Sequence, residues 1–138
     1  MSDREQAIAT LTAHLRKEQA IATLTANLRK EKAEWTKADS EWSAVSAMVD
    51  CGYMVVDGGL CIGRREGSLC AVFAKAGTTG PVGGAMFTRA GAENVAKEAN
   101  RQTGVHGDWT VVFYRDYPRK RLAEVAAMAA EIGVSLDG

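Results

Sequence analysis

The chain has 138 residues, of which 46% are hydrophobic and 25% charged, and its 17 basic and 17 acidic side chains give zero formal net charge. This composition is typical of one soluble globular domain with room for an appendage. Zero net charge excludes a global attraction to nucleic acid or to an anionic membrane, but it leaves a local basic patch open. The first thirty residues carry charges throughout, and no stretch approaches the ~20 apolar residues that span a bilayer. We therefore expect no signal peptide, no membrane contact and a cytoplasmic protein.

Residues 1–50 are predicted to form one long N-terminal helix. Ser2 and Glu5 have the spacing of a capping box, and neither glycine nor proline occurs before Gly52. Good helix formers dominate the segment, and Gly52 stands where a left-handed residue would end the helix. We place the domain boundary after this helix, so that residues 51–138 form a small α/β head.

The helix contains a near-perfect tandem repeat of thirteen residues. Residues 5–17 and 18–30 differ only at one position, where His14 is replaced by Asn27. Such identity indicates a recent duplication. An alternative to one unbroken helix is a break near 38–40, where an Asp-Ser pair would cap a second helix.

The apolar residues of the two repeat units point in different directions. Those of the second unit continue a heptad seam toward the head; this second stripe consists of Ile21, Leu24 and Leu28, and the seam continues through Trp35, Trp42 and Val49. The first stripe consists of Ile8, Leu11 and Leu15. Thirteen residues rotate it by about 220°, which places it about 140° from the second stripe. Unless the chain bends, the two stripes meet different surfaces.

We expect both stripes to mediate helix association, with a homodimer through the N-terminal helix as one outcome. Direct binding of a target and a frayed, solvent-exposed first unit remain open as alternatives. For Trp35 and Trp42 we expect packing against the head or in a dimer, with target contact as the alternative.

After Gly52 the apolar period changes from that of a helix to that of a strand. Strands are predicted at 53–56, 60–64, 68–74 and 109–114, with hairpin turns at 57–58 and 65–66. Helices are predicted at 88–103, closed by Gly104, and from Asp116 to about Ile132. The order α-β-β-β-α-β-α predicts an α+β fold in which a mainly antiparallel four-stranded sheet carries two helices on one face. The position of the fourth strand is left open.

Two other features of the head invite a functional interpretation. If an even number of residues joins the second and third strands, Cys61 and Cys70 face each other, as two small buried side chains or as a redox-sensitive pair. The glycine-rich segment 77–84 precedes a helix but lacks the Lys-Ser/Thr ending of a phosphate-binding loop. We expect this segment to be a flexible crossover or a target-contact loop.

No catalytic or metal-binding constellation is apparent. His14 occupies an exposed repeat position, and His106 lies in a predicted turn where a surface polar role is expected. Three cysteines with spacings of ten and nine fit neither a disulfide framework nor a metal site. We therefore predict a protein that is not an enzyme and that needs no cofactor or metal.

Basic side chains are the best clustered of the polar residues, and we take them as the candidate partner-binding set. They are Arg64, Arg65, Arg89, Arg115, Arg119, Lys120 and Arg121. Several lie at helix starts, where positive charge gains nothing from the helix dipole. An acidic protein surface or a nucleic-acid backbone would fit them; the alternative is an ordinary solvated basic face.

The pattern A-x-F-T-R-x-x-A-E-x-V-A at 85–96, with the strands at 60–63 and 109–112, resembles small phage and prophage accessory proteins. The resemblance covers residues 53–115; the glycine-rich segment and the duplicated helix depart from it. Proteins of this type include anti-CRISPR and other anti-defence inhibitors. The resemblance implies steric blockade of a host protein or ribonucleoprotein complex, in the cytoplasm of a bacterial host cell. The alternatives are a nucleic-acid-associated accessory protein and a helix-mediated structural oligomer.

Overall fold

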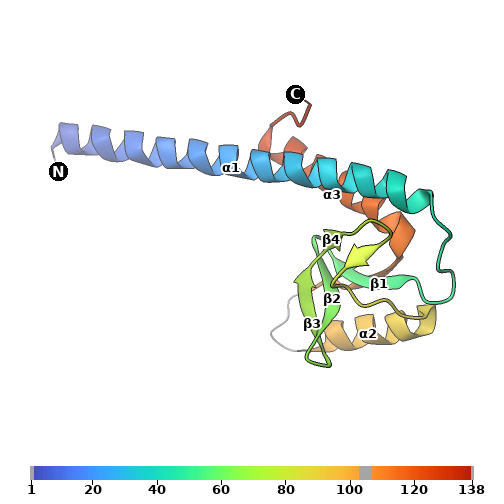
Figure 1. Cartoon of the computed structure of the whole chain (residues 1–138). Helices are drawn as coiled ribbons and strands as arrows, with labels where there is room; N and C mark the ends of the chain where they lie inside the picture. Colours follow the sequence, from blue (N-terminus) through green and yellow to red (C-terminus); the bar gives the residue numbers. More distant parts are fainter. Residues whose placement is uncertain (1, 103–106, 138) are drawn as a thin grey trace.

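The computed structural model describes residues 2–102 and 107–137 and confirms the predicted α+β fold and the order of its main elements (Figure 1). His106 and Gly104 lie outside the described residues. In chain order the elements are α1 (Asp3–Ser43), β1 (Tyr53–Asp57), β2 (Leu60–Arg65), β3 (Ser68–Phe73), β4 (Lys75–Ala76), β5 (Pro81–Val82), α2 (Arg89–Arg101), β6 (Thr110–Phe113), the 3-10 turn η1 (Tyr114–Asp116) and α3 (Tyr117–Ile132).

Helix α1 is unbroken, so the alternative of a break near 38–40 is wrong. It begins at the predicted cap, where the Ser2 hydroxyl accepts a hydrogen bond from the Glu5 amide at 3.3 Å. It ends at Ser43 and not near residue 50, so Val49 leaves the predicted seam and is exposed. Arg115 of the head stabilises this end of the helix, because it donates hydrogen bonds to carbonyl oxygens at and just beyond the last turn.

The main sheet has the order β3-β2-β1-β6, and all its neighbouring strands are antiparallel. The β2–β3 turn consists of Glu66 and Gly67, both with positive φ, and not of residues 65–66 as predicted. The fourth strand, β6, lies beside β1, with Val55 opposite Val111. The sequence had left this position undecided.

The register of β2 and β3 corrects the expected cysteine pair. The connecting turn has two residues, an even number as assumed, but it places Val72 opposite Cys61 and Gly63 opposite Cys70. The thiols are therefore offset by two residues along the ladder. Cys61 is buried and Cys70 is half-buried, and neither forms a disulfide.

The two helices of the head lie on opposite faces of the sheet, and the prediction that they share one face is wrong. Val55 of β1 packs with Ala92 of α2 on one face. Its neighbours Met54 and Val56 face the other side, where Tyr117 of α3 and the tryptophans of α1 cover them. Because side chains alternate along a strand, a run of three fully buried residues requires cover on both faces.

The second half of α1 belongs to the core of the head. Trp35 lies edge-on to Tyr117 with ring centroids 5.0 Å apart, and to Trp42 at 6.0 Å. The expected core packing of both tryptophans is thereby confirmed. Leu28 packs against Val125 and Ala129 of α3, which lies along this half of α1 (Figure 1).

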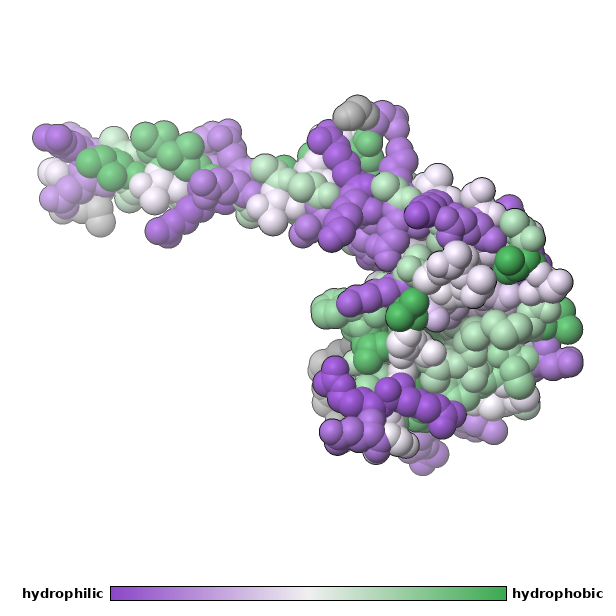
Figure 2. Space-filling view, in the orientation of Figure 1, coloured by the Kyte–Doolittle hydropathy of each residue, from purple (hydrophilic) through white to green (hydrophobic). Residues whose placement is uncertain are grey.

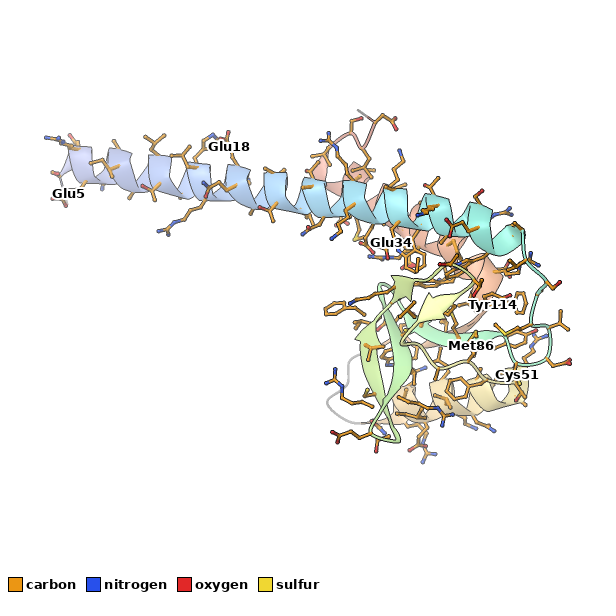
Figure 3. All side chains as sticks on the ribbon, in the orientation of Figure 1. Glu5, Glu18, Glu34, Cys51, Met86 and Tyr114 are labelled. Atoms are coloured by element: carbon orange, nitrogen blue, oxygen red, sulfur yellow. The ribbon has the colours of Figure 1, made fainter. Side chains whose placement is uncertain are left out.

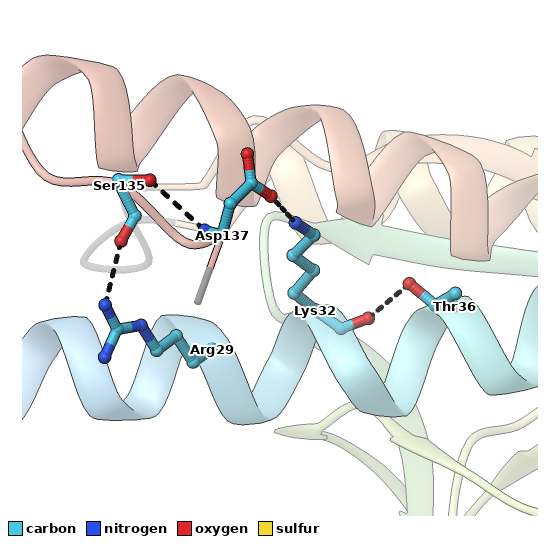
Figure 4. Close-up of polar contacts among 5 residues, drawn as sticks. All are labelled: Arg29, Lys32, Thr36, Ser135 and Asp137. Atoms are coloured by element: carbon cyan, nitrogen blue, oxygen red, sulfur yellow. Dashed lines mark hydrogen bonds and ion pairs between the residues drawn. The ribbon is translucent and has the colours of Figure 1, made fainter.

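The segment that follows α3 is held against α1 by hydrogen bonds (Figure 4). Gly133 ends α3 in the left-handed conformation that glycine adopts easily. Beyond it, Lys32 Nζ donates to Asp137 Oδ1 at 2.8 Å, and Arg29 Nη2 donates to the Ser135 carbonyl at 3.1 Å. The hydrogen bond and charge of Lys32 lower the pKa of Asp137.

The glycine-rich segment, for which a flexible crossover or a target-contact loop was expected, takes part in a small hairpin, β4–β5. The Gly77 amide donates to the Gly80 carbonyl at 2.8 Å. Two residues of α1 hold this hairpin: Trp42 Nε1 donates to the Gly77 carbonyl at 2.8 Å, and the Glu34 carboxylate accepts from the Ala76 amide at 3.1 Å. The segment is therefore part of the cover over the α1 side of the sheet.

Candidate interaction surfaces

Residues 3–27 of α1, here called the arm, project beyond the head (Figure 1). Every arm residue is exposed except Ile21 and Thr25, which are half-buried. Figure 3 shows Glu5 and Glu18 on the projecting part, far from the sheet and its helices. The exposed part of the arm lacks the packing that supplies most helix stability in proteins.

Large apolar side chains interrupt the polar surface of the arm (Figure 2). The exposed fractions of the first stripe are 55% for Ile8, 59% for Leu11 and 50% for Leu15, and Leu24 of the second stripe is 41% exposed. Because α1 is continuous, the first stripe points about 140° away from the side that meets the head. A contiguous exposed apolar stripe is typical of a protein-interaction site.

Leu28 was predicted to mediate helix association together with the other residues of the two stripes, and this prediction is wrong. Leu28 is 2% exposed, because α3 covers the second stripe at this point. The other five predicted residues of the two stripes remain accessible. Leu15, which occupies the same place in the first repeat unit, is 50% exposed.

The predicted basic cluster divides into structural and solvent-facing residues. Arg121 is only 8% exposed and forms a two-pronged ion pair with Glu31, at 3.0 and 2.8 Å. Burial opposes its charge, but the hydrogen bond and charge of Glu31 raise the pKa of Arg121 above its usual value. Glu31 occupies the position of the heptad seam between Leu28 and Trp35, and its pairing with buried Arg121 explains why a charged residue stands there.

Arg115 is likewise engaged within the chain. Its Nε donates to the Trp42 carbonyl at 3.1 Å, and its Nη2 donates to the carbonyls of Ser43 and Val45 at 2.7 and 2.9 Å. It supplies the positive charge at the end of α1, whose last turn has no basic residue of its own. These contacts give Arg115 a role in ending α1 within the chain.

The remaining five basic residues are exposed but belong to separate parts of the head. Arg64 and Arg65 lie at the β2–β3 hairpin, with the Arg64 guanidinium 5.9 Å from the Phe87 ring centroid. Arg89 pairs with Glu93 on α2 at 3.4 Å. The other two, Arg119 and Lys120, lie at the start of α3, where Arg119 pairs with Asp39 at 3.2 Å.

An open groove of about 340 Å³ lies between α2 and the β2–β3 half of the sheet. Its lining is mainly apolar and includes Ile62, Leu69 and Val95. Its polar residues are Asn94, Glu98 and Gln102. Within residues 2–102 and 107–137, no three His, Cys, Asp or Glu side chains converge as metal ligands. Burial raises the pKa of the Cys61 thiol, which makes this residue a poor nucleophile.

None of the helices in the described part of the chain combines the length and the apolar character that crossing a bilayer requires. Comparison of the chain with protein-family models, with curated proteins and with solved structures found no match.

Proposed function

We propose that this chain is a non-enzymatic binding protein that engages another protein through its arm. The observation that carries the proposal is the first stripe, in which three large apolar side chains are each at least half exposed on the part of α1 that projects beyond the head. Hydrophobic burial is the main driving force of protein association. An amphipathic helix that docks with residues spaced by three and four is a recurrent recognition mode.

Several contacts favour a protein partner over nucleic acid. The two basic residues with the most extensive hydrogen bonding, Arg115 and Arg121, are satisfied within the chain. Arg89 and Arg119 each have a carboxylate neighbour, which reduces their attraction for phosphate. Nucleic-acid binding depends on many unpaired cations that act together.

The resemblance to phage accessory proteins supplies the partner class that we propose first, a host defence complex such as a CRISPR effector. In that setting the arm would dock on the effector, and the head would occlude the adjoining surface. The arm spans about 37 Å at 1.5 Å per residue. This length allows the head to sit well away from the point of docking.

A pull-down from a bacterial lysate that contains a CRISPR effector tests the proposal. The bait is the full chain, compared with a variant in which the first stripe is changed to glutamine (I8Q/L11Q/L15Q). The matched control is R64Q/R65Q, which alters two exposed basic residues of the head. We expect the stripe variant to lose effector capture and the control to retain it. Recovery of nucleic acid alone, sensitive to salt and to the control substitutions, would refute the proposal.

A further inference from the structure

We infer that the first stripe binds the same stripe of a second copy of this chain, with the two arms antiparallel. The inference rests on the proposed use of the arm in protein binding, and it takes a second copy of the chain, in place of a host protein, as the occupant of the first stripe. It depends on the surface that the arm presents after the first stripe, on the sizes of the residues that would meet, and on the charges at the two ends of the arm.

The first stripe is part of a longer exposed face. At about 100° per residue, Ala22 and Ala26 lie within roughly 40° of the mean direction of Ile8, Leu11 and Leu15. All five side chains are exposed. One half of the face thus carries large apolar residues, and the other half carries alanines.

Side-chain size favours the antiparallel arrangement. In that arrangement Ile8 can meet Ala26 of the second copy, and Leu11 can meet Ala22, with Leu15 near the twofold axis. Ile8 and Leu11 each face an alanine, so the two helices can approach closely on both sides of the twofold axis. A parallel pair would place large residues together in one half and alanines together in the other, which leaves gaps.

Charge favours the same arrangement. The first turn of α1 carries Asp3 and Glu5, whereas Arg29 and Lys30 lie near the other end of the overlap. In the antiparallel register Glu5 approaches Lys30 of the second copy, and both side chains are exposed. Arg4 and Arg29 also approach each other, but Arg29 already donates to the Ser135 carbonyl. A parallel pair would collect both basic residues of each copy at one end.

The heads do not obstruct this pairing. The shared face points about 140° away from the seam through which Leu28, Trp35 and Trp42 meet the head. Two copies joined through the first stripe therefore carry their heads on the outer sides and at opposite ends of the paired arms. Glu5 and Glu18 show how far this part of α1 extends from the head (Figure 3).

The first experiment is light scattering over a concentration series, with two matched double variants of the full chain. A22E/A26E puts charges on the shared face, and A13E/A20E puts the same charges on exposed positions of roughly the opposite face. We expect wild type and A13E/A20E to dimerise. We expect A22E/A26E to dimerise roughly 30-fold more weakly or not at all, because each glutamate would be buried without a partner. A monomeric wild type, or equal weakening by both variants, overturns the inference.

The second experiment fixes the direction of the arms by thiol cross-linking. In a C51S/C70S background, I8C and A26C are made separately; Cys61 is retained because it is buried. With a short thiol cross-linker, we expect a covalent dimer from the mixture of I8C and A26C. Neither variant should cross-link when alone. A dimer from I8C alone would establish a parallel pair and overturn the inference.

These outcomes separate the inference from the proposed function. If wild type is monomeric but the I8Q/L11Q/L15Q variant loses capture of a host protein, the arm binds a foreign partner and the self-pairing inference fails alone. If the chain dimerises antiparallel and captures no host protein, the inference stands and the proposed host target fails.

Discussion

Leu15 and Leu28 occupy the same place in the two repeat units, yet we expect their replacement by alanine to have different effects. Leu15 is 50% exposed on the arm, whereas Leu28 is 2% exposed under α3. Their local sequences, Thr-Ala-His-Leu-Arg-Lys and Thr-Ala-Asn-Leu-Arg-Lys, are nearly the same. Any difference between the two variants therefore measures tertiary packing and not helix propensity.

The expected loss in the free energy of unfolding follows from how deeply each leucine is buried. Truncation of a buried leucine removes its transfer free energy and leaves a cavity, at a cost of 2–5 kcal/mol. Leu28 contacts Val125 and Ala129 near the end of α3, so we expect L28A to lower the free energy of unfolding by about 3 kcal/mol. For L15A we expect a change within about 0.5 kcal/mol, as for other exposed sites.

Urea unfolding followed by tryptophan fluorescence measures both values, because Trp35, Trp42 and Trp109 are all buried in the head. The measurement is made at concentrations where light scattering reports a monomer, so that weakened arm pairing does not contribute. An L28A effect below about 1 kcal/mol, or one no larger than that of L15A, would contradict the packing of α3 on α1.

Three further predictions concern the head. Replacing Arg115 by alanine removes three hydrogen bonds at the end of α1, and we expect the free energy of unfolding in urea to fall by about 2 kcal/mol. The control replaces exposed Lys120 by alanine, which should lower it by less than about 0.5 kcal/mol. Equal losses would argue against the role of Arg115 at the end of α1. Burial raises the pKa of Tyr117, with a smaller opposing effect of Arg121. The resulting stability is present below the unfolded pKa of about 10 and is lost as pH rises above it, so in an alkaline absorbance titration Tyr117 should ionise only together with unfolding; an early, reversible titration of every tyrosine would contradict this. Cys51 is exposed and Cys61 buried, so a thiol reagent should label Cys51 in the native protein and Cys61 only after urea is added; rapid native labelling of Cys61 would show that the core is open there.

Much of the local structure could be predicted because its causes are local. Ser2 caps α1 and Thr88 caps α2, where its hydroxyl accepts from the Gly91 amide at 3.1 Å. Helix α3 ends at Ile132 as expected, and Gly133 is its C-cap. These assignments depend on which residues satisfy exposed amides and carbonyls within a few positions along the chain.

The roles of the residues in the predicted basic cluster were predicted less well, because these roles depend on contacts between distant parts of the chain. Arg121 lies ninety residues from Glu31, and Arg115 lies about seventy from the carbonyl groups it binds. Clustering in sequence did not reveal that these two arginines serve the fold. The sequence also left open which edge of the sheet β6 occupies. It placed α2 and α3 on the same face of the sheet, which is wrong, since alternation along a strand does not say which helix covers which face.

The duplicated helix shows most clearly what the sequence determines and what only the tertiary structure decides. The sequence alone determined that the first and second stripes diverge by about 140°, because the angle follows from thirteen residues at a fixed helical pitch. Only the tertiary structure decided that the second stripe is covered at Leu28 and that the first stripe is left free. The physical reason is the position of α3, which lies along the second half of α1 and gives the identical leucine of the first repeat unit nothing to pack against.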